Sequence, residues 1–193
     1  GFFSSIMVMI LTVPLGTAYT DHLTRPHWQG RYPLQDTVAA FHQLVEDGKI
    51  RYWGVSNFDH RALAELQDVP GSSGLATDQV LYNLSRRGPE YDLLPWCTDH
   101  QLPVMAYSPI EQGRILDDTT LNDVAARHSV SPAAAALAWA LRRDSLCTIP
   151  KASSPQHVRD NATALDVQLT REDLDALDRA FPPPSGPRPL EML

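Results

Sequence analysis

Cysteine is scarce in this sequence. The 193 residues include two, Cys97 and Cys147, which are too few for the disulfide framework that stabilises small secreted domains. We therefore expect a cytoplasmic protein whose two thiols stay reduced and behave as small apolar side chains.

Clustered positive charge is also missing. Sixteen Lys and Arg residues stand against twenty-three Asp and Glu residues, which gives a formal net charge of -7. A surface that binds nucleic acid needs grouped Lys and Arg to neutralise phosphates. The charge pattern therefore argues against a nucleic-acid partner.

The apolar run at residues 2–15 contains no Lys or Arg and ends at Pro14 and Gly16. A membrane-spanning helix needs about 20 apolar residues, and a signal peptide needs a basic start. We expect no membrane partner and interpret the run as a buried or poorly ordered segment. A targeting or anchoring role is the alternative.

Helical and strand-like patterns alternate through the rest of the chain. Strand-like runs at 51–55, 76–81, 103–107 and 145–149 are separated by stretches with helical spacing, and Ile50, Tyr52 and Val55 share the first strand pattern. Such alternation predicts an α/β fold with a parallel sheet and crossover helices. The fingerprint Gly-x-Gly-x-x-Gly is absent, so nothing favours the doubly wound sheet that periodicity alone would allow.

Several residues predict where helices begin and end. Gly48 fits a helix stop, and Asp59 fits a helix cap. Ser131-Pro132 and Ser154-Pro155 each place a capping hydroxyl before proline at the first helical position. Thr170 opens a last helix that ends by Phe181 and precedes a proline-rich, irregular tail.

Four segments resemble successive strand ends of the aldo-keto reductase superfamily. They occur in the family's order and spacing, and the resemblance runs from about residue 35 to residue 184. Within the superfamily the chain is most similar to the bacterial methylglyoxal-reductase-like and general oxidoreductase branch, through residues 86–88 and 93–97. The four segments are 48–58, 78–83, 104–109 with Gln112-Gly113, and 149–154 with Asp160-Asn161.

The resemblance implies part of a (β/α)8 TIM barrel, covering roughly the last four or five strand-helix units. A closed barrel typically needs about 250 residues, more than this chain has. We expect residues 1–34 to be an atypical N-terminal segment, and a remnant of the fourth barrel strand is one interpretation of it. We expect residues 35–184 to form the C-terminal part of the barrel and residues 185–193 to be an irregular tail.

The resemblance also implies a nicotinamide cofactor, NADP(H), at the carboxyl ends of the strands. Ser56, Asn57 and Gln79 match positions that bind the nicotinamide carboxamide, and Tyr107 matches a ring that stacks on the nicotinamide. The remaining matches are Ser108, Pro109, Ile110 and Gly113 at the pyrophosphate, Lys151, Ser153 and Ser154 at the 2′-phosphate, and Asn161 at the adenine.

Two positions depart from the family pattern near the 2′-phosphate. His157 stands where many members place Arg, and Ala152 replaces a frequent Ser. Both changes weaken a strict preference for NADP over NAD, whereas Lys151 favours it.

Catalysis in the family uses Asp, Tyr and Lys from the first three strand units, with a His that orients the substrate oxygen. The chain begins after those units, and His27 resembles the family's His, with a solvated loop histidine as the alternative. His22 and His27 lack further residues at metal-ligand spacing, so no metal is expected.

We therefore expect an NADP(H)-dependent reductase of small aldehydes or ketoaldehydes that is feeble or inactive as this truncated chain. The alternative is a non-catalytic nucleotide-binding protein or a remnant half-barrel. Exposed barrel edges would allow such a chain to associate with itself.

Overall fold

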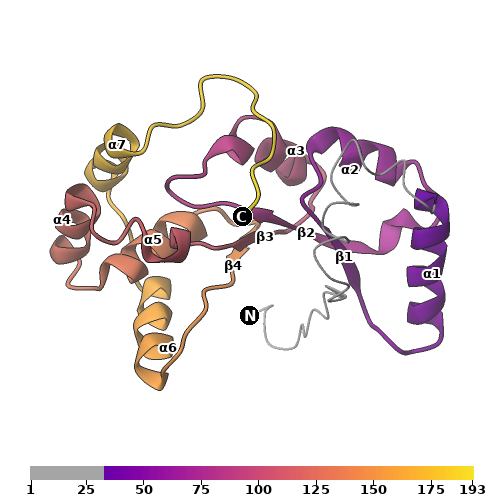
Figure 1. The fold of residues 1–193 in the computed structure, drawn as a ribbon, viewed down its shortest axis with the longest axis horizontal. Coiled ribbons are helices and arrows are strands. Elements are labelled where there is room, and N and C mark those ends of the chain that lie inside the picture. Colours follow the sequence, from indigo (N-terminus) through magenta and orange to yellow (C-terminus); the bar gives the residue numbers. More distant parts are fainter. Residues whose placement is uncertain (1–32) are drawn as a thin grey trace. The chain divides into compact units, whose positions relative to one another are not determined.

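The computed structural model describes residues 33–193, which form alternating helices and strands (Figure 1). Within this part of the chain no helix is both long and apolar enough to cross a bilayer. The strands are β1 (Trp53–Ser56), β2 (Leu75–Leu81), β3 (Val104–Tyr107) and β4 (Leu146–Thr148). The α-helices are α1 (Leu34–Glu46), α2 (His60–Gln67), α3 (Leu93–Asp99), α4 (Thr119–Arg127), α5 (Pro132–Leu141), α6 (Pro155–Ala162) and α7 (Arg171–Ala180). The short 3-10 helices are η2 (Ser72–Gly74), η3 (Gly88–Glu90), η4 (Glu111–Gly113) and η5 (Thr163–Leu165).

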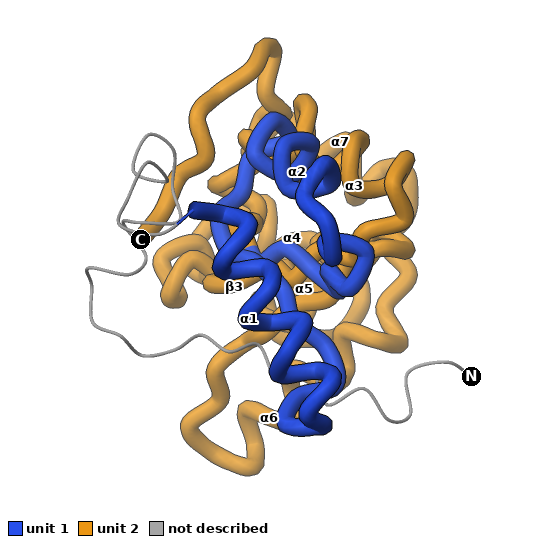
Figure 2. The backbone as a smooth tube through the Cα atoms, turned by 90° about the vertical axis from the view of Figure 1, so that its right-hand side faces the viewer, with its two compact units in different colours: residues 1–79 blue, residues 80–193 orange. Residues whose placement is uncertain are grey.

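The chain divides into two compact units, residues 1–79 and 80–193 (Figure 2). In the first unit β1 pairs with β2 in parallel, and Val55 faces Asp78 in the register. Gly54 of β1 lies so close to β2 that a Cβ at position 54 would be 2.7 Å from the Thr77 carbonyl oxygen. No larger residue fits at position 54 without moving one of the strands.

The first strand begins two residues later than predicted. Ile50 and Tyr52 both precede β1, and Tyr52 is 48% exposed, whereas Trp53 and Val55 are the inward residues of the strand. Trp53 stacks on Phe41 of α1 with ring centroids 5.2 Å apart. Burial of the large Trp53 ring, rather than that of Tyr52, determines which face of β1 points into the core.

In the second unit β3 pairs with β4 in parallel, with Val104 opposite Leu146. The alanine-rich helix α5 is buried along almost its whole length, because its small side chains allow neighbouring elements to approach closely. One apolar cluster combines α5 with the segments around it, including Ala134, Leu137, Ala138, Ala164, Ile110, Val130, Leu141 and Val167.

The predicted helix signals are confirmed. The side chains of Asp59, Ser131, Ser154 and Thr170 each accept a backbone N–H at the start of their helix, and Gly48 follows α1 with φ of 68°. Residues after Phe181 form neither helix nor strand. Both cysteines are free thiols, with Cys97 buried and Cys147 half-buried.

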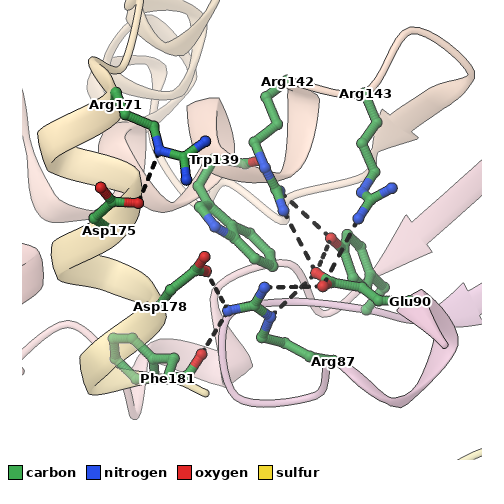
Figure 3. Close-up of polar contacts among 10 residues, drawn as sticks. Arg87, Glu90, Trp139, Arg142, Arg143, Arg171, Asp175, Asp178 and Phe181 are labelled. Carbon is green, nitrogen blue, oxygen red and sulfur yellow. Dashed lines mark hydrogen bonds and ion pairs between the residues drawn. The ribbon is translucent and has the colours of Figure 1, made fainter. Parts of the chain in front are cut away.

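A buried ionic cluster joins η3, α5 and α7 (Figure 3). Arg87 is 6% exposed and contacts Glu90 at 2.8 Å and Asp178 at 2.7 Å. Its guanidinium lies over the Trp139 ring, and that of Arg142 lies 4.0 Å from the centroid of the same ring. Burial would raise the pKa of Glu90, but hydrogen bonds from Arg87 and Tyr82 outweigh it and leave the pKa lowered. The charges of Arg87 and Glu90 are therefore paired within the cluster, which connects elements of the fold.

Candidate functional site

Three of the predicted cofactor residues meet at the carboxyl ends of β1 and β2. Ser56 lies opposite Gln79 in the strand register. The Ser56 hydroxyl and the Asn57 backbone N–H both donate to the Gln79 carbonyl oxygen, each at 2.9 Å. Asn57 has φ of 58°, a conformation that Asn tolerates better than most residues. These contacts fix the backbone from which the Ser56, Asn57 and Gln79 side chains extend.

The chemistry of this group suits a primary amide. Ser56 uses its proton on Gln79, so its oxygen keeps lone pairs that can accept an amide N–H. Asn and Gln side chains carry both donors and acceptors. A flat carboxamide needs this mixture, because it presents an acceptor oxygen and two N–H donors.

Asp78 is a neighbour of this group that the sequence did not single out. The side chain is fully buried, and its Oδ1 accepts the Phe58 backbone N–H at 3.5 Å. Burial, with a smaller contribution from the charge of Asp59, raises the pKa of Asp78 to about 8. The group is therefore protonated at neutral pH. A carboxyl among the inward residues of a strand is the signal that could have found it.

In the second unit the turn after β3 carries the next predicted residues. Tyr107 ends the strand and is half-buried, Ser108 follows with φ of 49°, and Pro109 is buried. Ile110 packs against the α5 cluster, and Gly113 closes η4 with φ of 89°. The structure thus holds these residues in one tight loop at the carboxyl end of β3.

The residues after β4 form a separate polar group at the start of α6. Ser154 caps the helix by accepting the His157 backbone N–H at 3.2 Å, and Ser153 Oγ lies 3.3 Å from His157 Nδ1. Asn161 lies one turn later on α6, and Lys151 is exposed just upstream. A cation, two hydroxyls and a helix N-terminus together suit a phosphate group.

His27 lies outside the described residues, as does His22. Among residues 33–193 no group of three or more His, Cys, Asp or Glu side chains could hold a metal ion. Glu111 is a further residue that sequence reasoning missed. It is buried inside the loop after β3 and contacts Asn83, Arg86 and Arg114.

Parallel strand pairs and connecting helices define an α/β protein, and comparison with known proteins identifies the family. The profile described as "Aldo/keto reductase family" matches residues 13–181. The chain belongs to the aldo/keto reductase family. The predicted fold class, part of a (β/α)8 barrel, agrees with this match and with the solved structures that resemble the chain.

Individual relatives support the same assignment. Methylglyoxal reductase YeaE of Escherichia coli is 46% identical over 184 residues, which cover 93% of this chain and 64% of that protein. Glyoxal reductase of Bacillus subtilis is 34% identical over 168 residues, covering 86% and 59%. An aldo/keto reductase of Klebsiella pneumoniae, crystallised with NADP and acetate, superposes with a TM-score of 0.82 at 46% identity, covering 85% and 60%. The chain thus spans less than two thirds of the length of these relatives.

Proposed function

We propose that the complete protein reduces small aldehydes or ketoaldehydes by hydride transfer from NADPH. The relatives named for methylglyoxal and glyoxal reduction support this substrate class, and the Klebsiella pneumoniae structures that contain NADP or NADPH support the cofactor. Residues 35–184 supply the cofactor-binding part of the barrel in this proposal.

Each cofactor group has a proposed set of partners. Ser56, Asn57 and Gln79 bind the nicotinamide carboxamide, and Tyr107 stacks on the nicotinamide ring. The loop with Ser108, Pro109, Ile110 and Gly113 covers the pyrophosphate. Lys151, Ser153, Ser154 and His157 bind the 2′-phosphate, and Asn161 contacts the adenine. The bound cofactor supplies the hydride, while these side chains orient it.

The observation that carries the proposal is the arrangement at the Gln79 carbonyl. Two hydrogen bonds of 2.9 Å hold Ser56 and Asn57 against it. Such an arrangement places amide-binding side chains on rigid strand ends, where ligands of parallel α/β folds bind.

A titration of NADPH followed by its fluorescence tests this assignment. We expect Ser56→Ala to weaken binding about tenfold, because one hydrogen bond to the carboxamide and the contact with Gln79 are lost together. Ser72→Ala is the matched control, since the Ser72 hydroxyl also donates to a backbone carbonyl, that of Gln67 at 3.0 Å. Equal NADPH affinity in the wild type and Ser56→Ala would remove the carboxamide assignment.

A second candidate is a nucleotide-binding protein without chemistry. The family's catalytic Asp, Tyr and Lys belong to strand units that the sequence resemblance does not cover, so we propose that this chain alone is feeble or inactive. The assay is NADPH oxidation with methylglyoxal. Ordinary turnover, about 1 to 10³ per second, would contradict the proposed inactivity, whereas binding without turnover would support the second candidate.

A further inference from the structure

The loop after β3 has an unusual backbone for so short a segment. Ser108, Glu111 and Gln112 have positive φ angles of 49°, 49° and 56°, and Gly113 has 89°. Residues other than glycine seldom adopt this conformation, and each one costs free energy unless the surroundings fix it. Something outside the loop must therefore supply the interactions that keep it in this shape.

Donors outside the loop, Asn83 and Arg86, supply those interactions through the Glu111 carboxylate. The Glu111 side chain is 4% exposed, although glutamate is rarely buried unless it is paired. Oε1 accepts from Arg86 Nη2 and from Arg114 Nη2, both at 2.9 Å, and Oε2 accepts from Asn83 Nδ2 at 2.8 Å. Both carboxylate oxygens are thus occupied by donors from the loop and from the turn after β2.

Asn83 connects the same two segments a second time. Its Nδ2 also donates to the Ser108 carbonyl at 2.9 Å, and its Oδ1 accepts the backbone N–H groups of Ser85 and Arg86. The side chain is fully buried. The loop is therefore attached at its first residue through Asn83 and at its fourth residue through Glu111.

The negative charge of Glu111 is compensated by the neighbouring Arg86 and Arg114. Burial would raise the pKa of the carboxyl, but hydrogen bonds from Arg86, Arg114 and Asn83 outweigh burial and leave the pKa lowered. Arg86 has a further partner in the tail, Glu191, at 2.8 Å. An unpaired carboxylate in a loop that receives a phosphate would repel that phosphate. The pairing of Glu111 with two guanidinium groups is therefore a requirement of the site.

We propose that Glu111 is a positioning residue that holds the loop from Ser108 to Gly113 in the shape that receives the cofactor pyrophosphate. This inference rests on the proposed function. Glu111 makes no contact with the cofactor itself; it acts through the loop backbone, with Arg86 and Asn83 as its fixed supports.

Two variants of Glu111 distinguish its positioning role from a simple effect of its negative charge on phosphate binding. We expect Glu111→Ala to weaken NADPH binding about tenfold, and Glu111→Gln, which keeps part of the hydrogen bonding, to weaken it less. Removing the carboxylate also leaves two guanidinium groups uncompensated. Because Arg86 and Arg114 are 34% and 53% exposed, water screens their extra attraction for phosphate. NADPH binding that is unchanged or tighter in Glu111→Ala would overturn the inference.

A second ligand distinguishes positioning from general loss of structure. Adenosine 2′-monophosphate lacks the pyrophosphate, so we expect both variants to bind it as the wild type does. Weaker binding of this probe as well would indicate wider damage and overturn the specific role. Glu172→Gln, at an exposed position on α7, is the matched control and should change neither affinity.

Hydrogen exchange gives a readout that does not depend on the cofactor. We expect amides of residues 108–114 to exchange about tenfold faster in Glu111→Ala, because the strained loop loses its anchor. Unchanged exchange there would overturn the inference by itself. Failure of the wild type to bind NADPH would instead refute the proposed function, and the inference would fall with it.

Discussion

Single residues determine which cofactor the proposed site prefers. Lys151 is exposed next to Ser153 and Ser154, and His157 completes the group with Ser153 Oγ 3.3 Å from its Nδ1. In the proposal this group meets the 2′-phosphate that distinguishes NADPH from NADH. The exposed lysine is expected to contribute most of the discrimination, because an ammonium group can pair directly with a phosphate.

Lys151→Ala should weaken NADPH binding about tenfold, because a charge-assisted contact with phosphate is lost. NADH binding should not change. Lys49→Ala is the control, since Lys49 is also exposed and pairs with Asp47 at 2.9 Å. An equal loss of affinity for NADPH and NADH would show that Lys151 does not read the 2′-phosphate.

Asp78 makes a separate prediction about pH. The pKa of this buried carboxyl is raised from 3.8 to about 8 in the folded chain, so the native state holds a proton that the unfolded state releases. The free energy of unfolding should therefore fall as pH rises from about 4 to about 8 and level off above. Asp78→Asn should flatten this dependence and stabilise the chain by about 1 to 3 kcal/mol at pH 9.

Urea denaturation at several pH values measures this effect. Asp117→Asn, a change at an exposed position of the same residue type, should leave the pH dependence as it is in the wild type. A slope that survives in Asp78→Asn would show that another group carries the buried proton.

At the scale of elements, α4 and α7 are joined through one carboxylate. Asp173 accepts from Arg127 Nη2 at 2.6 Å, from His128 Nε2 at 2.8 Å and from the Thr170 backbone N–H at 2.9 Å. Burial would raise its pKa, but these hydrogen bonds, led by that of His128, lower it well below its usual range. One side chain thus caps α7 and fixes it to α4.

Asp173→Asn should lower the free energy of unfolding by about 2 to 4 kcal/mol at pH 7, because a buried, multiply bonded charge is lost. The folded pKa of Asp173 is lowered, so its contribution is complete above the unfolded pKa near 4 and is lost as pH falls. The difference between variant and wild type should therefore shrink in acid.

Asp175→Asn is the matched control on α7. Asp175 also pairs with an arginine, Arg171 at 2.9 Å, but that arginine is 87% exposed. Exposed pairs contribute little, so the control should change stability by less than about 0.5 kcal/mol. Comparable losses in the two variants would show that burial of Asp173 is unimportant.

Elements were predictable where the signal is local. The caps at Ser131, Ser154 and Thr170 follow from residues within one turn of each helix. The first strand was predicted from residue 51, whereas β1 begins at Trp53, whose ring packs on Phe41 of α1. The contacts of Glu111 with Arg86 and of Arg87 with Asp178 join residues 25 and 91 positions apart, a pairing that no single sequence reveals.

The candidate site was likewise predictable only where its signal is local in the sequence. The polar ends of β1 and β2 were visible because Ser56 and Asn57 directly follow an apolar strand. Asp78 and Glu111 were missed, since their importance comes from burial and from partners elsewhere in the fold. The motif at residues 86–88 was recognised as a family resemblance, and the structure shows its arginines in contact with Glu111 and Glu90.

At the scale of the whole molecule, self-association stays a prediction. Part of a barrel has strand edges that a second copy can cover. Light scattering after size-exclusion chromatography should then report twice the chain mass of 21.4 kDa. A monomer at all concentrations would contradict pairing, while leaving the assignment of the cofactor residues unaffected.

The central claim is that residues of this chain bind NADPH, and hydrogen exchange with and without NADPH tests it most directly. We predict slower exchange on binding in three segments, residues 56–58, 107–113 and 151–161. Exchange in α4 and α7 should not change. Absence of protection in all three segments at saturating NADPH, or protection confined to other parts of the chain, would contradict the account.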